Sequence, residues 1–218
     1  MNDYLCMGRN RFICHTELPY HITARCINRD WFSVEPENVW RVMTTHLHFI
    51  HLAFEIRIHA FVLMSNHFHL IASAPNGNLS EAMRFFMSES GRDLRTFSNR
   101  INVTYGSRFH RSLLSNQLYY QHAYKYLYRN PVMAGLCERV EDYRYSTLRS
   151  LLGLEKMEVP ICDDTHWETW GSRFATLEWL NTDTGHEDWE KIQKGLRRSV
   201  FKISPYKSRP SHLEVDAL

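Results

Sequence analysis

Residues 58–74 restrict the possible folds of this chain more than any other segment. Apolar residues keep a two-residue period on both sides of Ser65 and Asn66, at 58, 60, 62 and 64 and again at 68, 70, 72 and 74. This period is typical of β-strands that face a core, and a polar pair between two such runs predicts a turn. The sequence therefore predicts an antiparallel hairpin.

The second strand of this hairpin carries two histidines, His67 and His69. Alternation sends both imidazoles to one face, with Ile71 and Ser73, and sends Phe68, Leu70 and Ala72 to the other. Two imidazoles that point the same way from one strand can bind a single metal ion between them. Because the chain contains 13 histidines, a chance pair is an alternative, and the prediction requires a third ligand.

Four other segments surround the hairpin. Residues 20–26 alternate as a strand, with His21 and Arg25 on the polar face, and a helix runs from Pro36 to about Glu55. A second helix follows a capping box at 78–81, and a weaker strand covers 108–114 after a break at Tyr105 and Gly106. We expect the second helix to turn an apolar stripe inward: Leu79, Met83, Phe86, Leu94, Phe97 and Ile101.

The order strand, helix, strand, strand, helix, strand predicts an α+β fold. Such an order forms an antiparallel sheet with both helices packed on one face. The other face, which carries His21, Arg25, His67 and His69, is then expected to be open for binding.

A third helix supplies the missing ligand. It is predicted from Ser115 or Asn116 to Asn130, where Pro131 disfavours helical geometry and frees the Asn130 amide to turn toward the sheet. The helical period predicts one buried stripe (Tyr120, Ala123, Tyr124 and Leu127) and one half-exposed stripe (Tyr119, His122, Tyr126 and Asn130). Asn130 is the expected third ligand, with Tyr126 one turn earlier beside the metal.

This set of groups predicts a particular chemistry. A phenol with a pKa near ~10 is a poor nucleophile at neutral pH unless a cation favours its phenolate. Two imidazoles and an amide suit Mg²⁺ or Mn²⁺, and the set contains no thiolate of the kind that structural zinc sites use. Packing tyrosines and an ordinary asparagine helix end are the alternative interpretation of the same residues.

The charge pattern indicates a nucleic-acid partner. Residues 1–153 hold 17 Lys and Arg against 12 Asp and Glu, and 16 of those 17 cations are Arg, the side chain best suited to phosphates and base edges. A codon-usage preference is the alternative. The candidate DNA-binding residues are Arg25, Arg29, Arg84, Arg92, Arg95, Arg197 and Arg198.

The chain is expected to divide into a catalytic domain, 1–153, and a charge-segregated appendage, 154–218. Residues 154–190 hold 2 cations and 10 acids, and residues 191–209 hold 7 cations and no acid. Either the basic part grips DNA and the acidic part covers the basic sheet face when DNA is absent, or the two parts pair within a helical subdomain. Five scattered cysteines without a C-x-x-C pair, and no apolar run of membrane length, predict reduced thiols in a cytoplasmic protein with no membrane partner.

Two segments resemble the signatures of a known family. Residues 59–70, which contain His67 and His69, and residues 126–136, which contain Tyr126 and Asn130, resemble the motifs of single-tyrosine HUH transposases. The closer resemblance is to REP-associated tyrosine transposases, and it covers roughly residues 18–153. Ser65 stands where the family usually has Pro, and Tyr105 where it has Trp.

The resemblance implies a ferredoxin-like or RRM-like HUH endonuclease fold in a bacterial protein that cuts and rejoins single-stranded or hairpin DNA. His67, His69 and Asn130 would bind the metal, and Tyr126 would form a 5′-phosphotyrosine. One alternative is a catalytically silent module of the same fold that binds single strands or hairpins. Another is a metal hydrolase with His122 as a ligand and water as the nucleophile. Monomer or homodimer, and Tyr126 acting in its own or in a partner chain, remain open.

Overall fold

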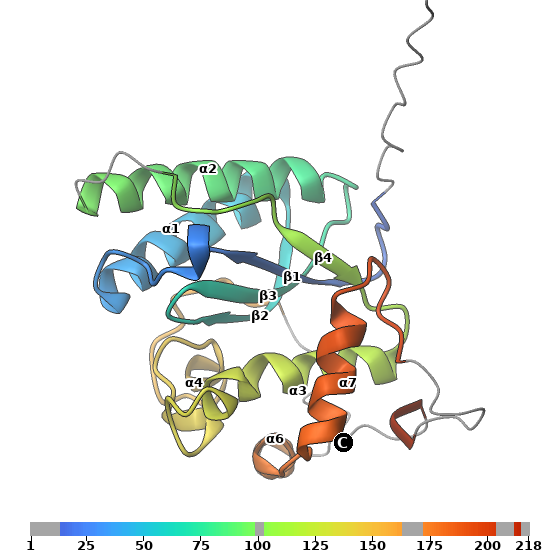
Figure 1. Ribbon diagram of the computed structural model, residues 1–218. Helices are drawn as coiled ribbons and strands as arrows, with labels where there is room; N and C mark the ends of the chain where they lie inside the picture. Colours follow the sequence, from blue (N-terminus) through green and yellow to red (C-terminus); the bar gives the residue numbers. More distant parts are fainter. Residues whose placement is uncertain (1–13, 99–102, 163–171, 204–211, 215–218) are drawn as a thin grey trace, which may run out of the picture.

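The computed structural model describes residues 14–98, 103–162, 172–203 and 212–214. Its first part builds a four-stranded sheet with the order β2-β3-β1-β4. Two helices connect the strands (Figure 1), and the elements of this part are β1 (Tyr20–Arg25), α1 (Pro36–Phe54), β2 (Arg57–Leu63), β3 (His67–Ser73), α2 (Leu79–Ser98) and β4 (His110–Leu113).

Every neighbouring pair of strands in the sheet is antiparallel. The helix α1 carries the chain from β1 past β3 to the sheet edge, and α2 carries it from β3 to the opposite edge, as in the split β-α-β folds. The predicted α+β fold with an antiparallel sheet is confirmed. Both ends of each of the four strands lie within two residues of the predicted bounds.

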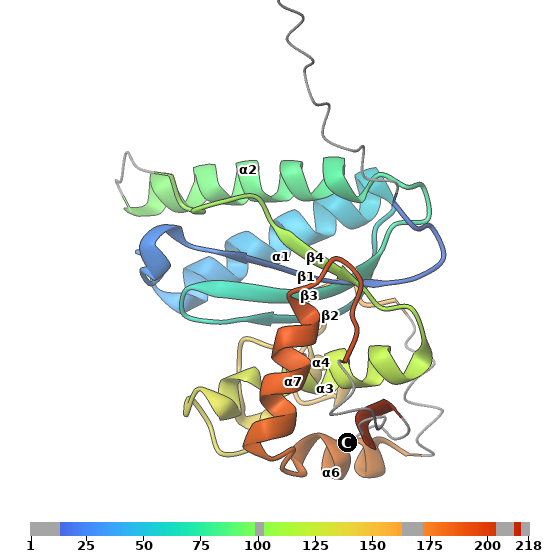
Figure 2. The same ribbon diagram turned by 45° about the vertical axis from the view of Figure 1, so that its right-hand side comes forward.

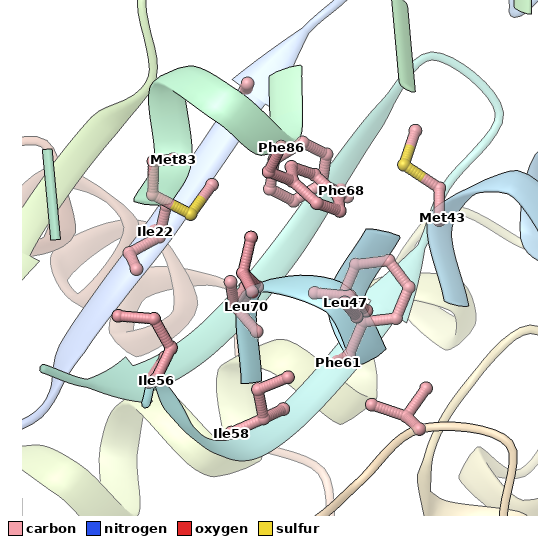
Figure 3. Close-up of a cluster of buried hydrophobic side chains, with 14 of the residues drawn as sticks. Ile22, Met43, Leu47, Ile56, Ile58, Phe61, Phe68, Leu70, Met83 and Phe86 are labelled. Carbon is pink, nitrogen blue, oxygen red and sulfur yellow. The ribbon is translucent and has the colours of Figure 1, made fainter. Parts of the chain in front are cut away.

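The helices α1 and α2 cover one face of the sheet and enclose the first hydrophobic core. Figure 3 shows side chains of both helices gathered with those of the strands in this core, among them Ile22, Met43, Leu47, Phe61, Phe68, Leu70, Met83 and Phe86. The inward stripe of α2 is confirmed except at its end. Phe97 is 54% exposed because α2 extends beyond the sheet there, and Ile101 lies outside the described residues.

A β-bulge changes the expected alternation of β2. The register shifts between Ile58 and Ala60 opposite β3, so one extra residue enters the strand. Ile58 therefore faces the first core, whereas Ala60 and Val62 face the opposite side of the sheet. The expectation that residues 58 and 60 share a face was therefore wrong. His59, which lies between them at the bulge, forms a hydrogen bond from Nε2 to Ser73 Oγ at 2.9 Å.

The predicted capping box of α2 does not form. Asn78 uses its side-chain Nδ2 to donate to the Phe54 carbonyl at 2.9 Å, and its Oδ1 has no hydrogen-bond partner among the described residues. The amide thus connects the start of α2 to the end of α1, where Glu55 adopts a left-handed φ of 55°. This long-range bond outweighs the local cap.

The second face of the sheet is covered as well (Figures 1 and 2). Across it lies α3 (Gln117–Met133), whose amino end is capped by the Asn116 side chain accepting from the Tyr119 amide at 2.8 Å. Beyond α3 follow α4 (Leu148–Leu151), α6 (Arg173–Asn181) and α7 (His186–Leu196). Ala60, Val62 and Ile71 form a second core with α3 and α7. The prediction that this face of the sheet is open was therefore wrong.

Helix α3 continues past its predicted end. Pro131 lies inside the helix, and the Ala134 amide still bonds the Asn130 carbonyl at 3.0 Å. A proline so near the carboxyl end removes one bond only, and its fixed φ is compatible with a helix. Tyr119, His122 and Tyr126 are 9%, 1% and 6% exposed rather than half-exposed, because residues from α7 onward cover that side.

After α7 the chain returns to the sheet. The Leu113 amide donates to the Ser199 carbonyl at 3.0 Å and the Phe201 amide donates to the Leu113 carbonyl at 2.9 Å, so residues 199–201 pair with the outer edge of β4. Phe201 is fully buried. No helix among the described residues is long and apolar enough to cross a membrane.

Candidate active site

The two histidines of β3 point toward the same position. The Nε2 atoms of His67 and His69 lie 3.1 Å apart, on the face of the sheet that α3 covers. Two ligands at right angles around a divalent cation, each at about 2.1 Å, are also about 3 Å apart. The pair thus has the spacing that two neighbouring ligands of one metal ion require.

Both rings are electrically suited to bind a cation. Burial lowers the pKa of His67 to about 4, and the nearby Arg25 adds to the shift. Burial also holds the pKa of His69 well below its ordinary value of 6.5, with smaller contributions from His67, His21 and Arg25. Neutral imidazoles at neutral pH keep a lone pair for a metal.

The loop before α1 fixes the orientation of His67. The His67 Nδ1 atom lies 2.7 Å from Asn66 Oδ1, and Asn66 Nδ2 donates to the Arg29 carbonyl in this loop at 2.8 Å. Asn28 and Arg29 both have left-handed backbone conformations, with φ of 56° and 62°, which cost free energy in residues other than glycine. The surrounding structure maintains this strained turn directly beside the histidine pair.

Tyr126 of α3 lies against the same histidines. Its ring centroid is 5.6 Å from that of His69 and 6.1 Å from that of His21, both edge to face. All three residues belong to one chain. The geometry therefore brings the predicted nucleophile and the predicted metal ligands together without a partner chain.

Burial raises the pKa of the Tyr126 phenol. The side chains of Gln193 and Asn130 oppose that shift by hydrogen bonding, and the charges of Arg197 and Arg25 oppose it more weakly. The groups that oppose it come from three elements of the fold: β1, α3, and α7 with its carboxyl end. Together they favour the phenolate that burial disfavours.

Asn130 lies one helical turn from Tyr126, as predicted, but its amide is not free. Nδ2 donates to the Tyr126 carbonyl at 2.6 Å, and this bond leaves Oδ1, the atom that would bind a metal, for other contacts. The described residues contain no group of three or more His, Cys, Asp or Glu side chains that could hold a metal ion. An amide ligand lies outside those residue types.

Two residues of α7 complete the surroundings of Tyr126, and neither was predicted from the sequence as a site residue. The Trp189 ring packs on the Tyr126 ring with centroids 4.4 Å apart, and Gln193 Nε2 lies 3.4 Å from the Tyr126 hydroxyl. A helical spacing of Trp189, Ile192 and Leu196 indicates an apolar face of α7. This apolar face was the one sequence signal that α7 packs against the rest of the fold, although the charged residues around it made the signal hard to see.

His21 also belongs to this cluster. Its Nε2 lies 2.9 Å from His69 Nδ1, it is 2% exposed, and its own Nδ1 has no hydrogen-bond partner among the described residues. His122, by contrast, is directed away from the cluster, with its Nε2 2.7 Å from the Leu213 carbonyl. The His122 Nε2 is therefore occupied by a backbone carbonyl and makes no printed contact with His67 or His69.

A basic groove lies between α2 and residues 103–111. Its volume is about 1530 Å³, and its cationic residues are Arg84, Arg95, Arg108 and Arg111, with Glu81 among the residues that line it. In the part of the chain that the structure describes, Arg84, Arg95 and Arg108 have no ion-pair partner. The unbalanced positive charge indicates an anionic ligand.

The other candidate DNA-binding arginines lie elsewhere. Arg92 of α2 is exposed but pairs with Glu89, and it does not line the groove. Arg25 is exposed at the end of β1, close enough to the histidines to affect their pKa values. Arg29 contributes its carbonyl to Asn66, while Arg197 and Arg198 are exposed at the carboxyl end of α7.

The basic part of the appendage, called the tail from here on, forms ion pairs within α7. Lys191 bonds Asp188 at 2.7 Å, and Lys194 bonds Glu190 at 3.0 Å. These pairs match the helical-subdomain interpretation of the tail in this region. Residues 163–171, which hold part of the acidic segment, lie outside the described residues.

Comparison with known proteins identifies the family of this chain. Residues 14–134 match the model of the family described as "Transposase IS200 like", and the chain belongs to this family. Among the solved structures that match is one titled "Structure of the REP associates tyrosine transposase bound to a REP hairpin", with 20% identity and a TM-score of 0.56, covering 73% of this chain and 96% of the other. A search of curated proteins found no match.

Membership in this transposase family makes the chain a DNA-processing enzyme. The family match ends at residue 134, directly after α3. The contacts of Trp189 and Gln193 with Tyr126 therefore come from a part of the chain beyond the matched segment.

Proposed function

We propose that this protein cuts and rejoins single-stranded DNA next to a hairpin, with Tyr126 as the nucleophile. The observation that carries the proposal is the 3.1 Å separation of the His67 and His69 Nε2 atoms beside the Tyr126 ring of the same chain. Cation ligands and a phenol at such close range are the components that phosphoryl transfer to tyrosine requires.

In the first step the Tyr126 oxygen attacks the phosphorus of one phosphodiester. The bond from phosphorus to the 3′-oxygen breaks, a tyrosyl ester with the 5′-phosphate forms, the phenol loses its proton and the 3′-oxygen gains one. In the second step a 3′-hydroxyl attacks the tyrosyl ester and restores both groups. The ester conserves the energy of the cut bond, so rejoining requires no nucleotide cofactor.

The chain's own residues prepare Tyr126 for the attack. Arg25 and Arg197 lower the pKa of the phenol by their charge, and Gln193 and Asn130 do so by hydrogen bonding. His67, His69 and Asn130 would hold Mg²⁺ or Mn²⁺, which supplies positive charge for the phosphate and the phenolate. Trp189 packs on the phenol ring and limits its rotation.

The basic groove supplies a place for the folded part of the DNA. Arg84, Arg95, Arg108 and Arg111 would contact phosphates of a hairpin stem, while Arg25 and Arg29 lie near the histidines, where the single strand is cut. The similar transposase structure is described as bound to a REP hairpin, which supports a hairpin as the substrate.

The covalent ester gives a direct test. The full chain is incubated with labelled single-stranded hairpin DNA and Mn²⁺, and a denaturing gel is used to detect a protein-DNA adduct. Tyr126→Phe removes only the attacking oxygen, so we expect no adduct and nearly unchanged DNA affinity. Tyr124→Phe is the matched control, because Tyr124 lies on the same helix and packs against Tyr120 and Tyr128 instead.

The test also separates the alternatives. A catalytically silent binding module would bind the hairpin without cutting it, and a water-using hydrolase would release free 5′-phosphates without an adduct. An adduct that persists in Tyr126→Phe but disappears in Tyr124→Phe would assign the nucleophile to Tyr124 and overturn the proposal.

A further inference from the structure

Five residues form one continuous chain of polar contacts that begins at a backbone carbonyl. Asn66 Nδ2 donates to the Arg29 carbonyl, and Asn66 Oδ1 lies 2.7 Å from His67 Nδ1. His67 Nε2 lies 3.1 Å from His69 Nε2, and His69 Nδ1 lies 2.9 Å from His21 Nε2. His67 and His69 therefore use both ring nitrogens in this chain of contacts, and His21 uses only its Nε2.

The Arg29 carbonyl fixes the direction of every bond in this chain. A carbonyl only accepts, so the Asn66 amide nitrogen must face it, and the Asn66 oxygen then faces His67. His67 must carry its proton on Nδ1, which leaves Nε2 bare. Without a cation, His69 must then donate from Nε2 to His67, and His21 must donate from Nε2 to His69 Nδ1.

A cation between the two Nε2 atoms requires a different arrangement. His67 already has a bare Nε2, but His69 must move its proton from Nε2 to Nδ1. The Nδ1 proton of His69 then faces His21 Nε2, so His21 must accept there and carry its proton on Nδ1. All three rings stay neutral, and only the positions of two protons change.

We propose that His21 is a positioning residue for His69, and that it changes tautomer together with His69 when the metal site fills. This inference rests on the proposed function, because it assumes that His67 and His69 bind the cation. His21 suits the role because one imidazole can either donate or accept at Nε2. Its Nδ1 has no described partner that would oppose the change.

A second orphaned polar group lies beside His21 on the sheet. Ser112 is paired with His21 across β1 and β4, it is fully buried, and its Oγ likewise has no described hydrogen-bond partner. A hydroxyl accepts or donates as required. No hydrogen bond joins the two side chains in this structure, and we take the Ser112 hydroxyl as the candidate acceptor for the new Nδ1 proton of His21.

Nuclear magnetic resonance measures the tautomers directly. In the ¹⁵N-labelled full chain without metal, we expect the ring nitrogens of His21 and His69 to report the Nε2–H form and those of His67 the Nδ1–H form. Saturating Mg²⁺ should convert His21 and His69 to Nδ1–H and leave His67 unchanged. A His21 that keeps one tautomer while Mg²⁺ binds would overturn the inference.

Variants of His21 provide a readout in metal affinity. His21→Leu leaves the Nδ1 proton of metal-bound His69 without an acceptor, so we expect the Mn²⁺ affinity, measured by electron paramagnetic resonance, to fall about 10- to 100-fold. His21→Gln restores an acceptor at nearly the same place and should stay within about threefold of the natural protein. An equal loss in both variants would indicate mere packing and would contradict the inference.

His59→Leu is the matched control, because His59 lies on the same sheet and hydrogen bonds with Ser73 instead. Its Mn²⁺ affinity should be unchanged. His67→Ala separates this inference from the proposed function on which it rests. Unchanged Mn²⁺ binding in His67→Ala would contradict the metal site itself, whereas a loss in His67→Ala with normal binding in His21→Leu would contradict only the role of His21.

Discussion

Burial acts in opposite senses on the two kinds of group at the site. It lowers the pKa of His67 and His69, which keeps both rings neutral and able to bind a cation. It raises the pKa of Tyr126, which keeps the phenol protonated and weakly nucleophilic. In the proposed mechanism, a cation bound by His67 and His69 would offset the effect of burial on the pKa of Tyr126, so the phenol would become a good nucleophile only when the cation is bound.

Removal of the metal or of a ligand should therefore abolish adduct formation. With His67→Ala or His69→Ala we expect Mn²⁺ binding and the covalent adduct to be lost in parallel. With His59→Ala we expect only a small decrease in both. A chelator should stop adduct formation by the natural protein, and added Mg²⁺ or Mn²⁺ should restore it. Adduct formation that continues under saturating chelator would contradict the metal requirement.

Lys125 provides a residue-scale prediction that is independent of catalysis. It is 2% exposed, its Nζ has no hydrogen-bond partner among the described residues, and it lies 5.2 Å from the centre of the Trp179 ring. Its pKa is lowered from 10.5 to about 8, mainly by burial and also by the nearby charge of Arg129, while Asp183 opposes the shift. The charged form is thus destabilising in the folded chain at pH 7.

Lys125→Met should raise the free energy of unfolding at pH 7 by about 2 kcal/mol, measured by urea unfolding. Between pH 8 and pH 10.5 the unfolded chain holds this proton and the folded chain does not, so the stability of the natural protein rises with pH through its Lys125. The advantage of the variant should shrink over the same range. A constant advantage would mean that Lys125 titrates normally.

At the scale of elements, the contact of α7 with the returning segment at Phe201 and Lys202 depends on Gly195. A Cβ added there would lie 2.5 Å from the Phe201 ring and 2.9 Å from the Lys202 carbonyl oxygen, so α7 and the returning segment touch with no room for a side chain. Gly195→Ala improves helix propensity, yet we expect it to cost about 1–3 kcal/mol through overpacking. Thermal unfolding shows whether Gly195→Ala lowers or raises the stability, and Lys194→Ala at the neighbouring exposed position is the control.

The sequence predicted those elements whose signal is local. The alternation in residues 67–74 depends on neighbouring residues, and the structure keeps His67 and His69 on one face as predicted. The contact between Tyr126 and Trp189 joins residues more than sixty positions apart, and no local pattern encodes it. For the same reason Tyr126 was expected to be half-exposed and was found buried.

At the scale of the whole molecule, the tail is part of the fold that holds the site. Trp189, Ile192 and Leu196 share the second core with Tyr126, and Phe201 extends that core to the edge of β4. Truncation after residue 153 would expose this core and remove Gln193 from the phenol. Such a truncation would change the stability, the surroundings of the Tyr126 phenol and the net charge at once. Substitution of single charged residues therefore tests DNA binding more cleanly.

The basic groove yields the last prediction. Each phosphate neutralised on duplex DNA contributes about 0.9 to the slope of log affinity against log salt, and about 0.7 on a single strand. If Arg84, Arg95 and Arg108 each contact one phosphate, replacing all three by Gln should reduce the slope by about 2–3 and weaken hairpin binding at low salt. Arg92→Gln is the matched control on the same helix, because Glu89 already balances its charge. A triple variant with the slope of the natural protein, measured by fluorescence anisotropy on hairpin DNA, would exclude the groove from DNA contact.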